Sequence, residues 1–231
     1  MSQKHEASMH LEFVVDELLL ESDKPAGERF QALRRELLML AFQGHSLSTY
    51  AERLFAVLPD FADWRDAIDL VRALSYSALH HGETHILTQV LHLEERWRRS
   101  LLRLDFRTSI HPAAIDALLQ GLPQCNESAA AICDAYSMLY RLVQEVPTHA
   151  AFDPIIPWSI AHLGAKPEGR GLKRRDSSAA AESFLLQLAK HPQWQAVVLQ
   201  GLAQRLERRC SKVERKVLEA TRERCSTTTT G

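Results

Sequence analysis

Apolar residues recur at intervals of three and four along almost the whole chain, and this spacing places them on one face of an α-helix. Residues 8–21 show the pattern well, because Leu11, Val14, Val15 and Leu18 fall on a single helical face. No convincing run of alternating β-branched residues indicates a strand. The sequence therefore predicts an all-α protein.

Glycine, proline and capping residues divide this pattern into roughly ten or eleven helices with short connections. Gly44 is expected to end the helix over residues 28–43, and His81-Gly82 to end a long helix that Asp60 caps. The other expected helices include a short one that ends at Leu58, and those over about 83–99, 112–122, 127–144, 152–163, 178–190, 192–208 and 211–224.

The helices come in pairs at a spacing of about 35–45 residues, which is the range of helical repeats. We therefore expect stacked antiparallel helix pairs in a HEAT-like α-solenoid, with a compact helical bundle as the alternative. Residues 1–225 are expected to form one domain that contains a loop at 164–178. The polar segment 226–231 is expected to be a disordered tail.

Composition places the chain among ordinary globular proteins, with 45% hydrophobic residues and a formal net charge of −1. There is no basic start followed by an apolar run, as a signal peptide needs, and no stretch of roughly 20 apolar residues that would span a membrane. The four cysteines form no CxxC pair, so they are expected to be reduced thiols. These features predict an intracellular protein of the cytoplasm or nucleus that does not contact a membrane.

Motifs of catalysis are missing from the sequence. There is no GxxxxGK phosphate loop and no GxSxG turn, and Gly169-Arg170-Gly171 lacks the third glycine of a dinucleotide-binding loop. No cysteine has a neighbouring histidine that would mark an activated thiolate. We therefore expect a protein that is not an enzyme and holds no cofactor.

The strongest candidate for a metal site is a group of histidines. His81, His85 and His92 would share a helical face if the helix were continuous, and histidine is a common zinc ligand. The spacing matches neither HExxH nor HxxEH, and Gly82 indicates a break between the first two. These three residues remain weak metal candidates, and solvated histidines are the favoured interpretation.

Two basic segments and one tryptophan are the candidate partner-binding residues. The tryptophan is Trp194, which we expect to be partly exposed because it lies in the first turn of a helix. The cations could bind protein subunits or meet DNA phosphates, although no aromatic interleaving or groove-reading motif supports sequence recognition. These cations are Lys173, Arg174 and Arg175 in the loop, and Arg208, Arg209, Lys212, Arg215 and Lys216 near the C-terminus.

Four helical segments follow one another in a distinctive order, namely SIHPAAIDALLQGLP (109–123), YSMLYRLVQEVPTHAAF (136–152), SAAAESFLLQLAKHPQW (178–194) and KVERKVLEATRER (212–224). The order and spacing of these segments resemble those of the C-terminal helical-repeat domain of the Fanconi anaemia group E family. The resemblance implies a nuclear, non-enzymatic adaptor of the Fanconi core complex, which bridges that complex to its ubiquitination substrate in DNA crosslink repair. It includes no functional motif, so no site residue is carried over.

The function expected from the sequence is therefore that of a helical-repeat adaptor or scaffold for protein–protein interaction. Two other interpretations stay open at this point. One is an all-α metal-binding protein or enzyme centred on the three histidines, and the other is a helical protein associated with a bacterial secretion apparatus.

Overall fold

The computed structural model describes residues 3–25, 27–61, 63, 65, 67–104, 110–124, 128–169 and 175–228, with side chains from residue 8 onward except that of residue 60. Within these ranges the secondary structure consists of twelve α-helices, short 3-10 turns and one isolated bridge between Glu168 and Arg175. The described residues contain no β-strand. The prediction of an all-α protein is confirmed. No described helix is both long and apolar enough to cross a membrane.

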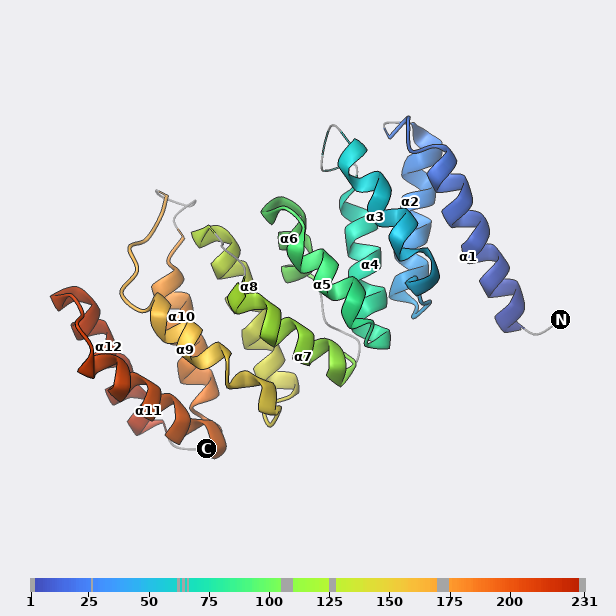
Figure 1. The fold of residues 1–231 in the computed structure, drawn as a ribbon. Coiled ribbons are helices and arrows are strands. Elements are labelled where there is room, and N and C mark those ends of the chain that lie inside the picture. Colours follow the sequence, from blue (N-terminus) through green and yellow to red (C-terminus); the bar gives the residue numbers. More distant parts are fainter. Residues whose placement is uncertain are drawn as a thin grey trace. The chain divides into compact units, whose positions relative to one another are not determined.

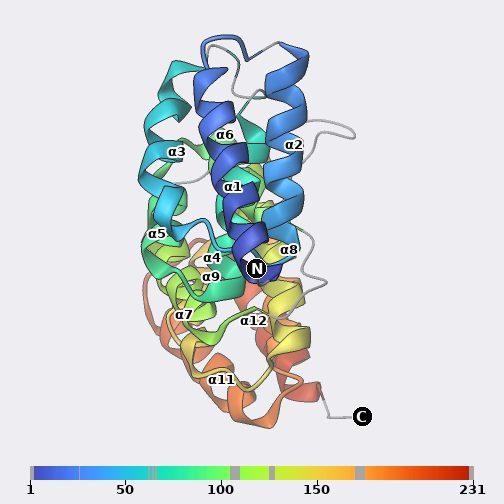
Figure 2. The same cartoon turned by 90° about the vertical axis from the view of Figure 1, so that its right-hand side faces the viewer.

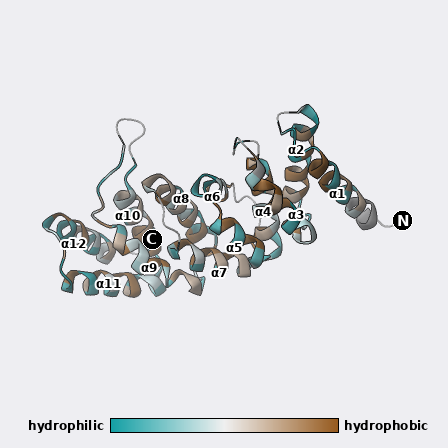
Figure 3. Ribbon diagram, turned by 45° about the horizontal axis from the view of Figure 1, so that its top comes forward, coloured by the Kyte–Doolittle hydropathy of each residue, from teal (hydrophilic) through white to brown (hydrophobic). Residues whose placement is uncertain are grey.

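The chain divides into two compact units, residues 1–118 and 119–231 (Figure 1). The division falls inside helix α7, which covers Pro112–Gly121. The single domain expected over residues 1–225 is thus described here as two units. In Figure 3 brown and teal residues alternate along most helices, as amphipathic helices require.

The first unit contains six helices before α7. Helix α2 packs against α1, as Figure 2 shows, and also against α4, which in turn contacts α5 and α6. The core stripe of α2 runs from Phe30 to Ala41 at helical spacing, and the Phe30 ring lies 5.4 Å from that of Phe61. These helices are α1 (Gln3–Leu20), α2 (Glu28–Phe42), α3 (Ala51–Val57), α4 (Ile68–His81), α5 (Thr84–His92) and α6 (Glu95–Leu102).

Two helix boundaries of the first unit differ from the prediction. The helix expected to follow Asp60 begins only at Ile68, because Phe61 adopts an extended backbone that places its ring in the core. The single helix expected over 83–99 is two helices, α5 and α6. The Arg98 guanidinium donates to the carbonyls of Leu91 and Leu93 at 3.0 and 2.5 Å, so it satisfies acceptors that the end of α5 leaves open.

The second unit contains five helices after α7, and α10 and α11 each pack against several of the others. Helix α10 contacts α8, α9 and α12, while α11 packs against α9 and α12. Aromatic rings fill the core, with Phe152 close to both Phe184 and Trp194. The helices are α8 (Ala129–Glu145), α9 (Ile155–His162), α10 (Ser177–Leu188), α11 (Pro192–Glu207) and α12 (Lys212–Thr227).

Polar side chains cap three of these helices, α8, α10 and α12. Ser128 accepts a hydrogen bond from the Ala131 amide, and Ser211 accepts one from the Glu214 amide. The cap of α10 is Asp176, whose carboxylate accepts a hydrogen bond from the Ala179 amide at 2.9 Å. Ser178 is occupied elsewhere, because its hydroxyl accepts from the Gly164 amide at 2.8 Å.

The predicted loop and tail are described in part. Glu168 and Arg175 exchange two backbone hydrogen bonds of 2.8 and 2.6 Å, so the described ends of the loop run antiparallel. Helix α12 continues through Thr227, two residues into the tail that the sequence assigned as disordered, while residues 229–231 lie outside the described residues. The assigned tail is therefore wrong at Ser226 and Thr227.

Candidate functional site

The histidines are not brought together into a metal site. Helix α4 ends at His81 and Gly82 takes a left-handed φ of 69°, so His81 and His85 lie on different helices. His81 Nε2 is 2.9 Å from the carbonyl oxygen of Gly44, and His92 Nδ1 is 2.7 Å from that of Thr88. Among the described residues no group of three His, Cys, Asp or Glu could hold a metal ion. The histidine hypothesis therefore gains no support.

Cys133 and Cys225 are not activated thiols. Burial raises the pKa of the Cys225 thiol to about 11 and also raises that of Cys133. A raised pKa leaves the thiol protonated at neutral pH, which opposes its use as a nucleophile. Cys133, Cys210 and Cys225 are free thiols, and Cys125 lies outside the described residues.

Trp194 is a core residue, and the expectation that it is partly exposed is wrong. Only 6% of the residue is exposed. Its indole Nε1–H donates to the Pro147 carbonyl at 2.7 Å, and its ring meets that of Phe152 edge-on at 6.0 Å. The first turn of α11 faces inward because the segment that joins α8 to α9 covers it, which local sequence does not reveal.

The C-terminal cations gather at the turn between α11 and α12. All five predicted there are exposed, namely Arg208, Arg209, Lys212, Arg215 and Lys216. Residues 205–216 contain six lysines or arginines and two glutamates, a formal charge of +4. We call this segment the basic turn. Of the loop cations, Lys173 and Arg174 lie outside the described residues, and Arg175 is exposed.

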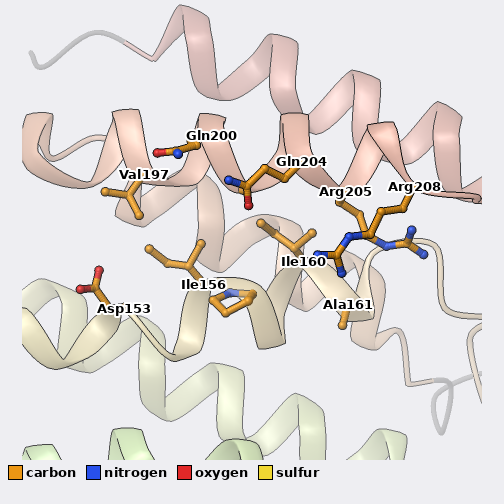
Figure 4. Close-up of a pocket in the computed structure, with 11 residues that line it drawn as sticks. Asp153, Ile156, Ile160, Ala161, Val197, Gln200, Gln204, Arg205 and Arg208 are labelled. Atoms are coloured by element: carbon orange, nitrogen blue, oxygen red, sulfur yellow. The ribbon is translucent and has the colours of Figure 1, made fainter.

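A groove runs between α9 and α11 in the second unit, with a volume of about 440 Å³ (Figure 4). Ile156 and Ile160 form its buried floor, while Val197 is exposed beside them. The helices approach closely at Gly201, where a Cβ would lie 2.7 Å from Ile160 Cδ1. The absence of a side chain at Gly201 thus lets α9 and α11 meet along the groove.

The groove is charged at its ends and polar along α11. Asp153 lies at one end and Arg208 at the other, as Figure 4 shows, with Gln200 and Gln204 between them. Arg205 is held by an ion pair with Glu214, so Arg208 is the more exposed cation of this end. The arrangement offers an apolar floor, amides that can both donate and accept, and opposite charges at the two ends. Sequence reasoning found Arg208 and missed the rest of the groove.

Comparison with known proteins adds no relative. No protein-family model matches the chain, and no curated protein or solved structure matches it. The fold and the groove therefore define only a class, an all-α protein with an open apolar groove and a cationic turn.

His162 gives the second unit a pH-dependent stability. Burial lowers the pKa of His162 from its ordinary value of 6.5, while its Nδ1 lies 2.8 Å from the hydroxyl of Tyr136. As the pH falls through about 6.5, this histidine becomes protonated in the unfolded chain but stays neutral in the folded chain. The free energy of unfolding is therefore highest above that pH, and it decreases as the pH falls toward the pKa of the folded state.

We expect the urea midpoint of the second unit to decrease between about pH 7.5 and 5.5, and His162→Gln to reduce this decrease. Burial also lowers the pKa of His80, so the first unit is expected to have a pH dependence of its own. Hydrogen exchange, followed for each unit separately, distinguishes the two. An equal pH dependence of the second unit in wild type and His162→Gln would contradict the prediction.

Proposed function

We propose that this chain is a non-enzymatic adaptor whose α9–α11 groove binds a segment of a partner protein. The observation that carries the proposal is the groove itself, in which the exposed side chains of Val197 and Ala161 lie beside a floor of buried isoleucines on two packed helices. Exposed apolar surface of this kind, rimmed by polar groups, is typical of sites that bind peptides or helices.

The groove specifies the chemistry of the segment. Apolar side chains of the partner would cover Val197 and Ala161, while Gln200 and Gln204 would pair with its backbone. A carboxylate at one end of the segment would pair with Arg208, and a cation at its other end would pair with Asp153. A protein segment fits this pattern better than DNA does, since phosphate binding makes no use of an apolar floor.

The proposed architecture is a set of stacked helix pairs. Within the second unit α11 and α12 contact one another across a four-residue connection, residues 208–211, and α9 packs against both α10 and α11. Short connections between contacting helices are typical of HEAT-like repeats, which use an extended surface to bind partners.

Affinity purification from the native cell, read by mass spectrometry, tests the proposal with matched variants. Val197→Glu places a carboxylate beside the apolar floor and Arg208→Glu reverses the charge at the groove end. Each is expected to reduce recovery of the same partner about tenfold, which corresponds to about 1.4 kcal/mol. Tyr140 in α8 is as exposed as Val197, 37% in both cases, so Tyr140→Glu is the control that should retain the partner.

Equal recovery from wild type, both groove variants and the control would exclude the groove as the binding surface.

The resemblance to the Fanconi group E domain gives the proposal its most specific form, a nuclear subunit for DNA crosslink repair. In that case the recovered partners would be DNA-repair subunits.

A further inference from the structure

Helix α1 carries apolar side chains on two opposite faces. One face is buried in the first unit through Leu11, Val14, Val15 and Leu18. Met9, Phe13 and Leu20 lie on the other face and are exposed. At about 100° per residue these three side chains fall within about 40° of one another, so they form a single stripe. We call it the α1 stripe.

Carboxylates flank the α1 stripe on both sides. Residues 9–21 contain four carboxylates and no lysine or arginine. Glu12 and Asp16 lie on one side of the stripe, and Glu17 on the other. Neighbouring arginines offset part of this charge, since Arg53 pairs with Asp16 at 2.7 Å and a second arginine pairs with Glu17. Two formal negative charges remain around an apolar surface.

The basic turn of the second unit has the complementary character. Val213 is 68% exposed, and the cations around it in sequence are also exposed. Glu214 is paired with Arg205, so it does not neutralise Lys212 or Lys216. Lysine and arginine also carry apolar stems that can cover hydrophobic side chains while their charges reach carboxylates.

The charge difference extends over the two units. Residues 1–118 contain 13 lysines or arginines and 18 acidic residues, and residues 119–231 contain 15 and 11. The formal charges are therefore −5 and +4, which the chain's net charge of −1 conceals. Opposite charges on two surfaces of one chain favour contact between the unlike surfaces of two copies.

We propose that copies of this chain associate head to tail, with the α1 stripe of one copy bound to the basic turn of the next around Val213. A symmetric contact between two α1 stripes is disfavoured, because it would place the carboxylates of both copies together. The contact joins unlike surfaces, so it can continue from copy to copy. Arg205 and Arg208 of the basic turn line the α9–α11 groove, whereas α1, Lys212, Val213 and Lys216 do not, so the variants that test this association leave the groove unchanged.

Sedimentation velocity of the full chain tests the association. We expect the mean mass of the wild type to rise with concentration at low salt, and to fall to that of a monomer in about 0.5 M NaCl because salt screens the charges. A wild type that stays monomeric up to about 100 μM, equivalent to a Kd much weaker than that, would overturn the proposal. Association that strengthens with salt would overturn it in favour of a symmetric apolar contact.

Variants at the two ends identify the surfaces. Phe13→Glu places a charge in the centre of the α1 stripe, and the double change Lys212→Glu with Lys216→Glu reverses two charges of the basic turn. Each of these two variants is expected to be monomeric alone. A mixture of the two retains one intact stripe and one intact turn, and is expected to form a dimer that grows no further. Met39 on α2 is 52% exposed and Phe13 is 56% exposed, which makes Met39→Glu the control that should still associate.

The mixing result discriminates between interfaces. All variants replace exposed side chains, so circular dichroism should show them folded. A mixture that remains monomeric while the wild type associates would show that copies meet through other surfaces, and would overturn the proposal.

Discussion

Trp194→Ala is expected to destabilise the second unit by about 3–5 kcal/mol, the usual loss when a buried tryptophan is truncated. The side chain fills the space beside Phe152 and its indole N–H satisfies the Pro147 carbonyl. Removing it leaves a cavity between the start of α11 and the segment that joins α8 to α9. Urea unfolding followed by hydrogen exchange measures the loss and assigns it to the second unit.

Trp194→Phe separates the two contributions. Phenylalanine retains most of the ring volume and loses the N–H donor, while Gln193 Nε2 still donates to Pro147 at 3.1 Å. We therefore expect a smaller loss of about 1–2 kcal/mol. Val213→Ala, at an exposed position, should change stability by less than about 0.5 kcal/mol. If Trp194→Ala were as mild as Val213→Ala, the tryptophan would not be part of the core.

Gly164→Ala is expected to be the second severe substitution, for a backbone reason. Gly164 has a φ of 81°, and a Cβ there would lie 2.8 Å from the Cα of Glu214. The left-handed conformation alone costs a residue with a Cβ about 1–2 kcal/mol. Because the obstruction is the backbone of α12, the helix must move away, which adds about 1–3 kcal/mol.

Gly44→Ala is the matched control. Gly44 has a φ of 92°, and no atom lies within 4 Å of the position that a Cβ would take there. Gly44→Ala should therefore lose only the stability that the left-handed conformation costs, without a further loss from a steric clash. Chemical denaturation of both variants, with hydrogen exchange at residues 211–216, measures the difference. Equal losses for the two glycines would show that Gly164 does not pack against α12.

Much of the secondary structure follows from local sequence. The apolar spacing predicted the buried residues of α1 and α2, and Gly82 ended α4 in the left-handed conformation that glycine favours. Local sequence failed where a distant or unusual contact decides a boundary. Leu93 and Glu94 contain no helix breaker, yet the helix ends there with Arg98 holding its last carbonyls. A buried arginine in that role has no signature in the periodicity.

The candidate site was predictable only in its charged residues. Arg208, Arg209, Lys212, Arg215 and Lys216 are close in sequence, so a turn between two helices necessarily gathers them. The groove combines Ile156 and Ile160 of α9 with Val197 and Gly201 of α11, which lie far from them along the chain. Their meeting depends on how two helices pack, and helical periodicity contains no information about the partner of each face.

By itself, the sequence determined that the chain is helical and where most helices begin and end. Only the tertiary structure decided which apolar faces are covered. Trp194, which local position suggested was exposed, is buried, whereas Phe13 is exposed on the face of α1 opposite its buried apolar face. The physical reason is that helix formation depends on neighbours within about four residues, whereas burial depends on surfaces that chain reversals bring from far along the sequence.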